Sequence, residues 1–144
     1  MNTETAKNYL NQYRNAVANL QDKREELNKL YYNIGIQSSG IDTNKVQFSP
    51  RPDKIERQAI EIAELEKEIE ILEKIAAEIK KDTIETIKLV PDWRLRRILL
   101  YRYILDKNWQ SIAQSIGRTY KHTVNVLHKK ALLSLIKVNR YKKV

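Results

Sequence analysis

The chain has 144 residues and a net charge of +9, with three glycines, three prolines and no cysteine. One or two small, mainly helical domains fit this composition, and the lack of cysteine excludes disulfides and thiolate chemistry. No apolar run approaches the roughly 20 residues that span a bilayer, and the polar N-terminus lacks the apolar core of a secretory signal, so we expect a cytoplasmic protein without membrane contact.

The first predicted element is a long helix from about Thr3 to Ile34. Its apolar residues recur at alternating spacings of three and four, which is typical of a helix that packs along one seam against another helix. The seam residues are Leu10, Tyr13, Val17, Leu20, Leu27, Tyr31 and Ile34, with Arg24 in the one polar position. We expect Gly35 to end this helix, because helix C-termini favour glycine.

The segment from residue 35 to residue 53 is predicted to be a loop. It contains two glycines, two prolines and three serines, and these residue types favour turns over regular elements. Val46 and Phe48 are the apolar side chains that could anchor such a loop.

A second long helix should begin at Pro52–Asp53, since proline lacks the amide that a first helical turn leaves without a partner. Its heptad seam comprises Ile55, Ile62, Leu65, Ile69, Leu72, Ala76 and Ile79. Two such helices fit an antiparallel coiled-coil hairpin within one chain, and they fit a coiled coil between the subunits of a homodimer equally well. We therefore predict a domain of residues 1–90 that serves oligomerisation or interaction.

The clearest break in the chain is Lys88–Asp92. Pro91 disfavours helical geometry at the residue before it, and Asp92 is a suitable N-cap for the next helix. We predict that helix over residues 93–105, followed by a turn at residues 106–108. Its inner side carries Leu95, Ile98 and Leu99.

The stretch from residue 109 to residue 137 has the pattern of two helices separated by one turn. Gly117 tolerates the positive φ that such a turn requires, and Thr119 can cap the second helix. The first helix, 109–116, places on one face Trp109, Ile112, Ala113 and Ile116. The second helix, 120–137, is predicted to bury Val124, Leu127, Ala131 and Leu135.

A short apolar helix, a glycine turn and a longer helix with a polar outer face are typical of a helix-turn-helix that binds DNA. Together with the helix at 93–105, these two helices should enclose one small core that contains Trp109. We therefore expect an all-α protein in which a three-helix domain of residues 91–144 follows the helical hairpin.

The charge distribution favours the same function. Residues 92–144 contain 13 basic and two acidic side chains, a net charge of +11, whereas residues 1–91 carry a net charge of −2. A basic module attached to a nearly neutral scaffold is typical of a protein that binds a polyanion.

The residues also resemble a known family. Trp109-x-x-Ile112-Ala113, Gly117, Thr119, Val124 and His128-x-x-Ala131-Leu132 are similar to region 4 of sigma-70-type factors. They resemble more closely the small regulators of phages and prophages of Gram-positive bacteria, such as the ArpU- and RinA-type late transcription activators. Residues 42–53 are similar to a segment that these proteins carry between two N-terminal helices. The resemblance implies a transcription regulator of phage late genes in a bacterial host.

The resemblance also implies which residues enter the major groove. The family places an aliphatic residue six positions after the turn glycine, whereas Val124 lies seven after Gly117, so we expect a turn that is one residue longer. The recognition helix would then present Tyr120, Lys121, His122, Asn125 and Lys129.

The side-chain chemistry assigns a role to each contact. Asn125 suits a bidentate pair with adenine, Lys121 suits guanine, and Val126 suits a thymine methyl. The remaining predicted DNA-binding residues are Thr119 at the helix start and four residues that could neutralise phosphates, Arg118, Lys130, Arg94 and Arg97.

Three non-enzymatic functions are compatible with the sequence. The first is a sequence-specific transcription regulator, with duplex DNA as its partner and RNA polymerase as a candidate second partner. The second is a DNA-packaging protein similar to a small terminase subunit, although such proteins generally place the DNA-binding unit first in the chain. The third is a coiled-coil adaptor whose basic end binds an acidic protein. We expect no enzymatic activity, metal or cofactor, since the sequence contains no phosphate-binding glycine loop, activated nucleophile or ligand cluster.

Overall fold

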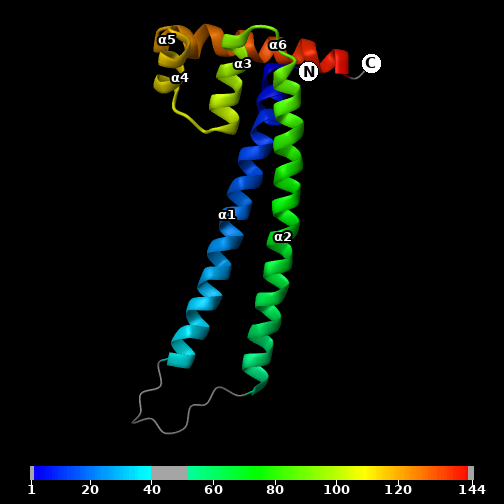
Figure 1. The fold of residues 1–144 in the computed structure, drawn as a ribbon, viewed down its shortest axis with the longest axis vertical. Coiled ribbons are helices and arrows are strands. Elements are labelled where there is room, and N and C mark those ends of the chain that lie inside the picture. The colour runs from blue at the N-terminus through cyan, green and yellow to red at the C-terminus, as the bar shows by residue number, and fades with distance from the viewer. Residues whose placement is uncertain (1, 40–51, 143–144) are drawn as a thin grey trace. The chain divides into compact units, whose positions relative to one another are not determined.

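A computed structural model of the chain describes the backbone of residues 2–39 and 52–142, and the side chains within 2–35 and 53–139. Every regular element in these ranges is helical, which confirms the all-α expectation (Figure 1). None of the described helices is long and apolar enough to cross a membrane. The elements are α1 (Thr3–Ser39), α2 (Pro52–Lys88), α3 (Trp93–Leu99), η1 (Leu100–Ile104), α4 (Trp109–Ile116), α5 (Tyr120–His122), η2 (Thr123–Leu127) and α6 (His128–Lys142), where η denotes a π-helix.

Both ends of the segment predicted as a loop, residues 35–39 and 52–53, belong to helices. Helix α1 continues through Gly35 to Ser39, so the prediction that Gly35 ends the helix was wrong. A glycine within a helix costs only about 1 kcal/mol relative to alanine, which a helix of this length tolerates. Helix α2 begins at Pro52 as predicted, whereas Val46 and Phe48 lie outside the described residues.

The chain divides into two compact units, and their limits differ from the predicted domain boundary between residues 90 and 91. Unit 1 comprises residues 1–16 and 76–144, and unit 2 comprises residues 17–75. Helices α1 and α2 each contribute residues to both units. The reason is that the start of α1 and the end of α2 complete the core on which the C-terminal helices pack.

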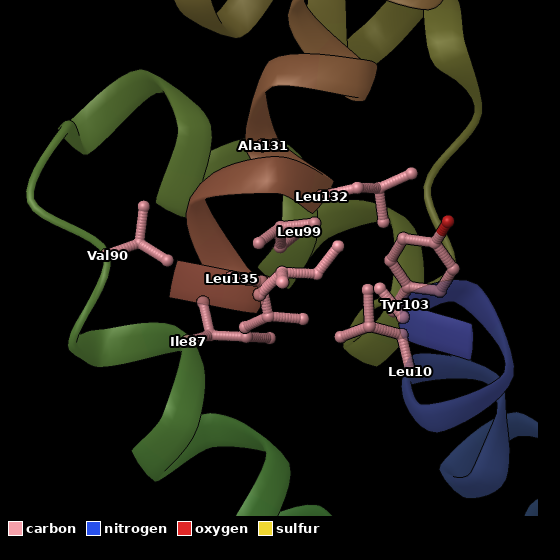
Figure 2. Close-up of a cluster of buried hydrophobic side chains, with 10 residues drawn as sticks. Leu10, Ile87, Val90, Leu99, Tyr103, Ala131, Leu132 and Leu135 are labelled. Atoms are coloured by element: carbon pink, nitrogen blue, oxygen red, sulfur yellow. The ribbon is translucent and has the colours of Figure 1, made fainter. Parts of the chain in front are cut away.

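The larger core of unit 1 collects side chains from five helical segments, α1, α2, α3, η1 and α6. Leu10 of α1 and Ile87 of α2 meet Leu99 of α3 and Leu135 of α6, and all four are fully or almost fully buried (Figure 2). The other buried members are Ala6, Val90, Tyr103, Ala131, Leu132 and Ile136. Residues 91–144 therefore supply only part of this core, because its α1 and α2 members lie outside that range.

A second, smaller cluster lies on another side of α3. Ile98 packs there with Ile112 and Ile116 of α4, and Trp109 and Leu127 border the cluster. The prediction of one core around Trp109 was therefore incomplete, because α3 separates two clusters and Trp109 borders the smaller one.

Unit 2 consists of antiparallel α1 and α2 segments. Leu20 packs against Leu65 and Ile69, and the polar pairs flanking this contact are Lys23 with Glu68 at 3.3 Å, Arg24 with Glu73 at 2.9 Å, and Tyr31 with Glu66. The pairs Arg24–Glu73 and Tyr31–Glu66 run in opposite order along the two helices.

The predicted seam of α1 is correct in the middle and wrong at two positions. Val17 and Tyr31 are 40% and 48% exposed, whereas Leu30 packs against the cluster instead. A straight α-helix drifts by about 20° per heptad relative to a 3.5-residue repeat, so a strict heptad assignment loses the contact line along a long helix. Ile55 of α2, 51% exposed, lies outside the contact for the same reason.

Candidate nucleic-acid interface

Helix α4 is defined at both ends by local hydrogen bonds. The Asn108 side chain caps its start by accepting from the Ser111 amide at 2.8 Å. Gly117 ends it with φ 67°, and the amide of Arg118 donates to the Ala113 carbonyl at 3.0 Å. A bond of this span over a left-handed residue is the Schellman arrangement, and it confirms the turn predicted at Gly117.

The next helix begins where Thr119 was predicted to cap it. The Thr119 hydroxyl accepts from the His122 amide at 3.2 Å, and its carbonyl accepts from the Thr123 amide at 3.0 Å. Only Arg118 and Thr119 therefore separate the turn glycine from the first residue of α5, Tyr120.

The predicted recognition helix contains a π-helical segment. Within η2 the His128 amide donates to the Thr123 carbonyl five residues before it, so this turn of helix holds one residue more than an α-helical turn. Thr123, six residues after Gly117, is 0% exposed, whereas Val124 is half-buried. The buried position of this helix is therefore six residues after Gly117, and the additional residue of the π-helical turn follows it.

Five predicted DNA-binding residues line one shallow hollow on this segment. They are Thr119, Lys121, His122, Asn125 and Val126, and the hollow has a volume of about 360 Å³. All five side chains are exposed. We call this surface the α5–η2 hollow. Its lining combines a cation, an imidazole, an amide and a branched apolar side chain, which can bind base edges by hydrogen bonds and apolar contact.

Four other predicted contacts do not line the hollow. Arg118, Tyr120, Lys129 and Lys130 are all exposed. Among the residues that the structure describes, none of the basic side chains Arg118, Lys121, Lys129 and Lys130 forms an ion pair with a carboxylate. Their positive charge therefore stays available for an external anion.

Arg94 and Arg97 belong to a different surface. The Arg97 guanidinium donates to the Ser115 carbonyl at 2.8 Å, which links α3 to the end of α4. Both guanidinium carbons lie 5.0 Å from the centre of the Trp93 ring. A hollow of about 300 Å³ is lined here by Trp93, Arg96, Arg97, Leu100 and Tyr101, and we call it the Trp93 hollow. The two hollows share no lining residue.

A buried polar pair supports α6 from within unit 1. The Tyr103 hydroxyl and His128 Nε2 are 2.8 Å apart, and the His128 ring meets the Trp109 ring edge-on with 4.7 Å between centroids. Burial lowers the pKa of His128 to about 4, and the nearby charges of Lys7 and Arg102 act in the same direction. The two partners are 25 residues apart, so helical spacing could not have predicted this pair.

Comparison of the chain with protein-family models, with curated proteins and with solved structures finds no match.

Proposed function

We propose that residues 109–142 form a helix-turn-helix that binds duplex DNA in the major groove, and that the protein regulates transcription without catalysing a reaction. The observation that carries this proposal is the α5–η2 hollow, in which the side chains suited to base recognition line one exposed surface. The major groove of B-DNA is wide enough to admit an α-helix, and it distinguishes all four base pairs.

Three of the lining residues have a defined role in this proposal. Asn125 would pair with adenine through its amide, Lys121 would donate to guanine, and Val126 would contact a thymine methyl. Arg118, Lys129 and Lys130 would neutralise phosphates and fix the register of the helix. Arg94 and Arg97 are not needed for this arrangement, and their contact with a flanking phosphate stays a prediction.

The biological role follows the resemblance to sigma region 4. A regulator of this kind would bind a promoter, and an oligomer formed through α1 and α2 would present two recognition helices to one site. Residues 92–144 carry a net charge of +11 and residues 1–91 a net charge of −2. This difference supports a division in which the C-terminal residues contact DNA and the N-terminal helices mediate assembly.

The experiment has two steps. The intact chain is first used to select binding duplexes from a random-sequence pool, and from a pool covering the genetic neighbourhood of its coding region. The affinity for the selected duplex and for a scrambled duplex is then measured by fluorescence anisotropy at several salt concentrations. We expect a strongly salt-dependent affinity that is at least about 1,000-fold higher for the selected duplex, the lower end of the usual range of specific binding.

Two variants separate base recognition from phosphate contact. Asn125→Ala should lower the preference for the selected duplex by about 1–3 kcal/mol and leave the salt dependence unchanged. Lys129→Ala should weaken binding to both duplexes equally and reduce the slope of log affinity against log salt by about 0.9. Equal affinity for both duplexes would reject base recognition, and no binding at low salt would reject DNA as the partner.

A further inference from the structure

We propose that the Trp93 hollow is a docking site for an acidic protein segment that carries an apolar or aromatic side chain. This surface goes beyond the proposed DNA contact and does not rest on it. The hollow follows α3 into η1, where Trp93, Arg97, Leu100 and Tyr101 recur at helical spacing along one side. The opposite side of the same segment is fixed in the interior by Ile98 and Leu99, which are fully buried.

The positive charges around the hollow are held in place without being neutralised. Arg97 donates to the Ser115 carbonyl, and Arg96 donates to the carbonyls of Val90 and Pro91 at 2.8 and 2.9 Å. Within the described part of the chain, neither arginine forms an ion pair with a carboxylate. A guanidinium fixed by a neutral carbonyl keeps its charge and its remaining N–H donors for an incoming carboxylate.

The aromatic rings add an apolar surface to this charge. Trp93 is 46% exposed, although its ring already has the guanidinium groups of Arg94 and Arg97 over it. Lys107 lies over the Tyr101 ring, with Nζ 4.3 Å from its centre. Such contacts keep long basic side chains near the rings, so binding orders fewer rotamers. Tryptophan, tyrosine and arginine are also the residues that contribute most to protein–protein binding.

This combination fits a protein segment better than a nucleic acid. In duplex DNA the bases are stacked inside the helix, so an aromatic-lined hollow would find no base to bind. A single-stranded base would need a free ring face, and guanidinium groups already lie over the Trp93 ring. A peptide with aspartate or glutamate beside a leucine, phenylalanine or tryptophan satisfies both parts of the surface.

The test is a selection on the intact chain with a display library of random dodecapeptides, sequenced before and after enrichment. We expect enriched peptides to combine acidic residues with at least one large apolar or aromatic side chain. The variant Trp93→Ala/Arg94→Glu should bind the best labelled peptide at least 10-fold more weakly in fluorescence anisotropy, while a circular dichroism melt confirms folding. Neither residue contributes its side chain to the buried clusters, so folding should be retained.

The matched control is Tyr120→Ala, which removes an aromatic side chain of similar exposure, 55%, elsewhere in unit 1. Peptide affinity should be unchanged in this variant. Enrichment of peptides without acidic residues, or equal binding by the Trp93→Ala/Arg94→Glu variant, would overturn the proposal. Loss of duplex or single-stranded DNA binding in that variant, with no peptide preference, would assign the hollow to nucleic acid instead. DNA binding that fails in the unmodified chain would reject the proposed function and leave this inference standing.

Discussion

At the scale of single residues, the pair of Tyr103 and His128 makes the stability of unit 1 depend on pH. The folded chain holds His128 neutral, with a pKa of about 4, whereas the unfolded chain binds a proton near pH 6.5. The unfolded state therefore binds more protons between these values, and folding loses free energy as the pH falls from about 6.5 towards 4. Above pH 6.5 this contribution of His128 to the free energy of unfolding is fully present.

We expect this loss to reach about 1–2 kcal/mol at pH 4, because the partly buried ring is still screened by solvent. The melting temperature should fall by about 5 °C from this cause. The measurement compares thermal melts at pH 7.5 and 4.5 for the natural chain and for His128→Gln, whose amide can still bond to Tyr103 but does not titrate. The acid-induced loss should be smaller in His128→Gln, and His122→Gln serves as the control on the exposed histidine. An equal loss in all three proteins would show that His128 does not contribute.

At the scale of elements, substitution by alanine should have opposite effects on stability at two glycines that have space for a methyl group. Gly117 has a positive φ, whereas Gly35 lies inside α1, and beyond the adjacent residues and the backbone of α1 no described atom lies within 4 Å of where a β-carbon would stand on either residue. The effect of an added methyl group on the free energy of unfolding therefore comes from the backbone conformation at both positions.

We expect Gly117→Ala to destabilise unit 1 by about 1–2 kcal/mol, because an L-residue is strained in the left-handed region. Gly35→Ala should instead stabilise the helix by about 0.5–1 kcal/mol, since alanine has the higher helix propensity. Chemical denaturation of both variants measures the two signs in one experiment. A stabilising Gly117→Ala would mean that the left-handed turn is not the native conformation.

Local signals predicted the ends of elements better than their interiors. The caps at Asp92 and Thr119 depend on side chains within three residues, so the sequence is sufficient to identify them. The π-helical turns could not be predicted, because their five-residue bonds depend on how η1 and η2 pack against the rest of unit 1. The exposed residues of the α5–η2 hollow followed from helical periodicity, whereas the rings beside Arg94 and Arg97 required the structure.

At the scale of the whole chain, the composition of unit 1 predicts which fragments fold. A fragment of residues 92–144 lacks Leu10, Ile87 and Val90, which are fully buried in the larger core. Burying one such side chain contributes about 1.5–3 kcal/mol, and the stability of a small domain is only about 5–15 kcal/mol. We expect this fragment to show no cooperative thermal unfolding by circular dichroism.

A matched deletion should give the opposite result. Replacing residues 17–75 with a flexible linker keeps both chain segments of unit 1, residues 1–16 and 76–144. This shortened chain should unfold cooperatively and should retain the edge-on contact of Trp109 with His128, visible in its near-ultraviolet spectrum. Cooperative unfolding of residues 92–144 alone would instead place a domain boundary near residue 91.

The π-helical segment η2 places one additional residue between α5 and α6. Its additional residue lies between Tyr120–His122 and the residues from His128 onward, and that later part keeps Ala131 and Leu135 in the core. A π-helical turn takes up such a residue by widening, so a deletion of one residue within Thr123–Leu127 would restore an α-helical turn with little rotation of α5 against α6. The chain can thus gain or lose one residue at this point while the core contacts of α6 are conserved.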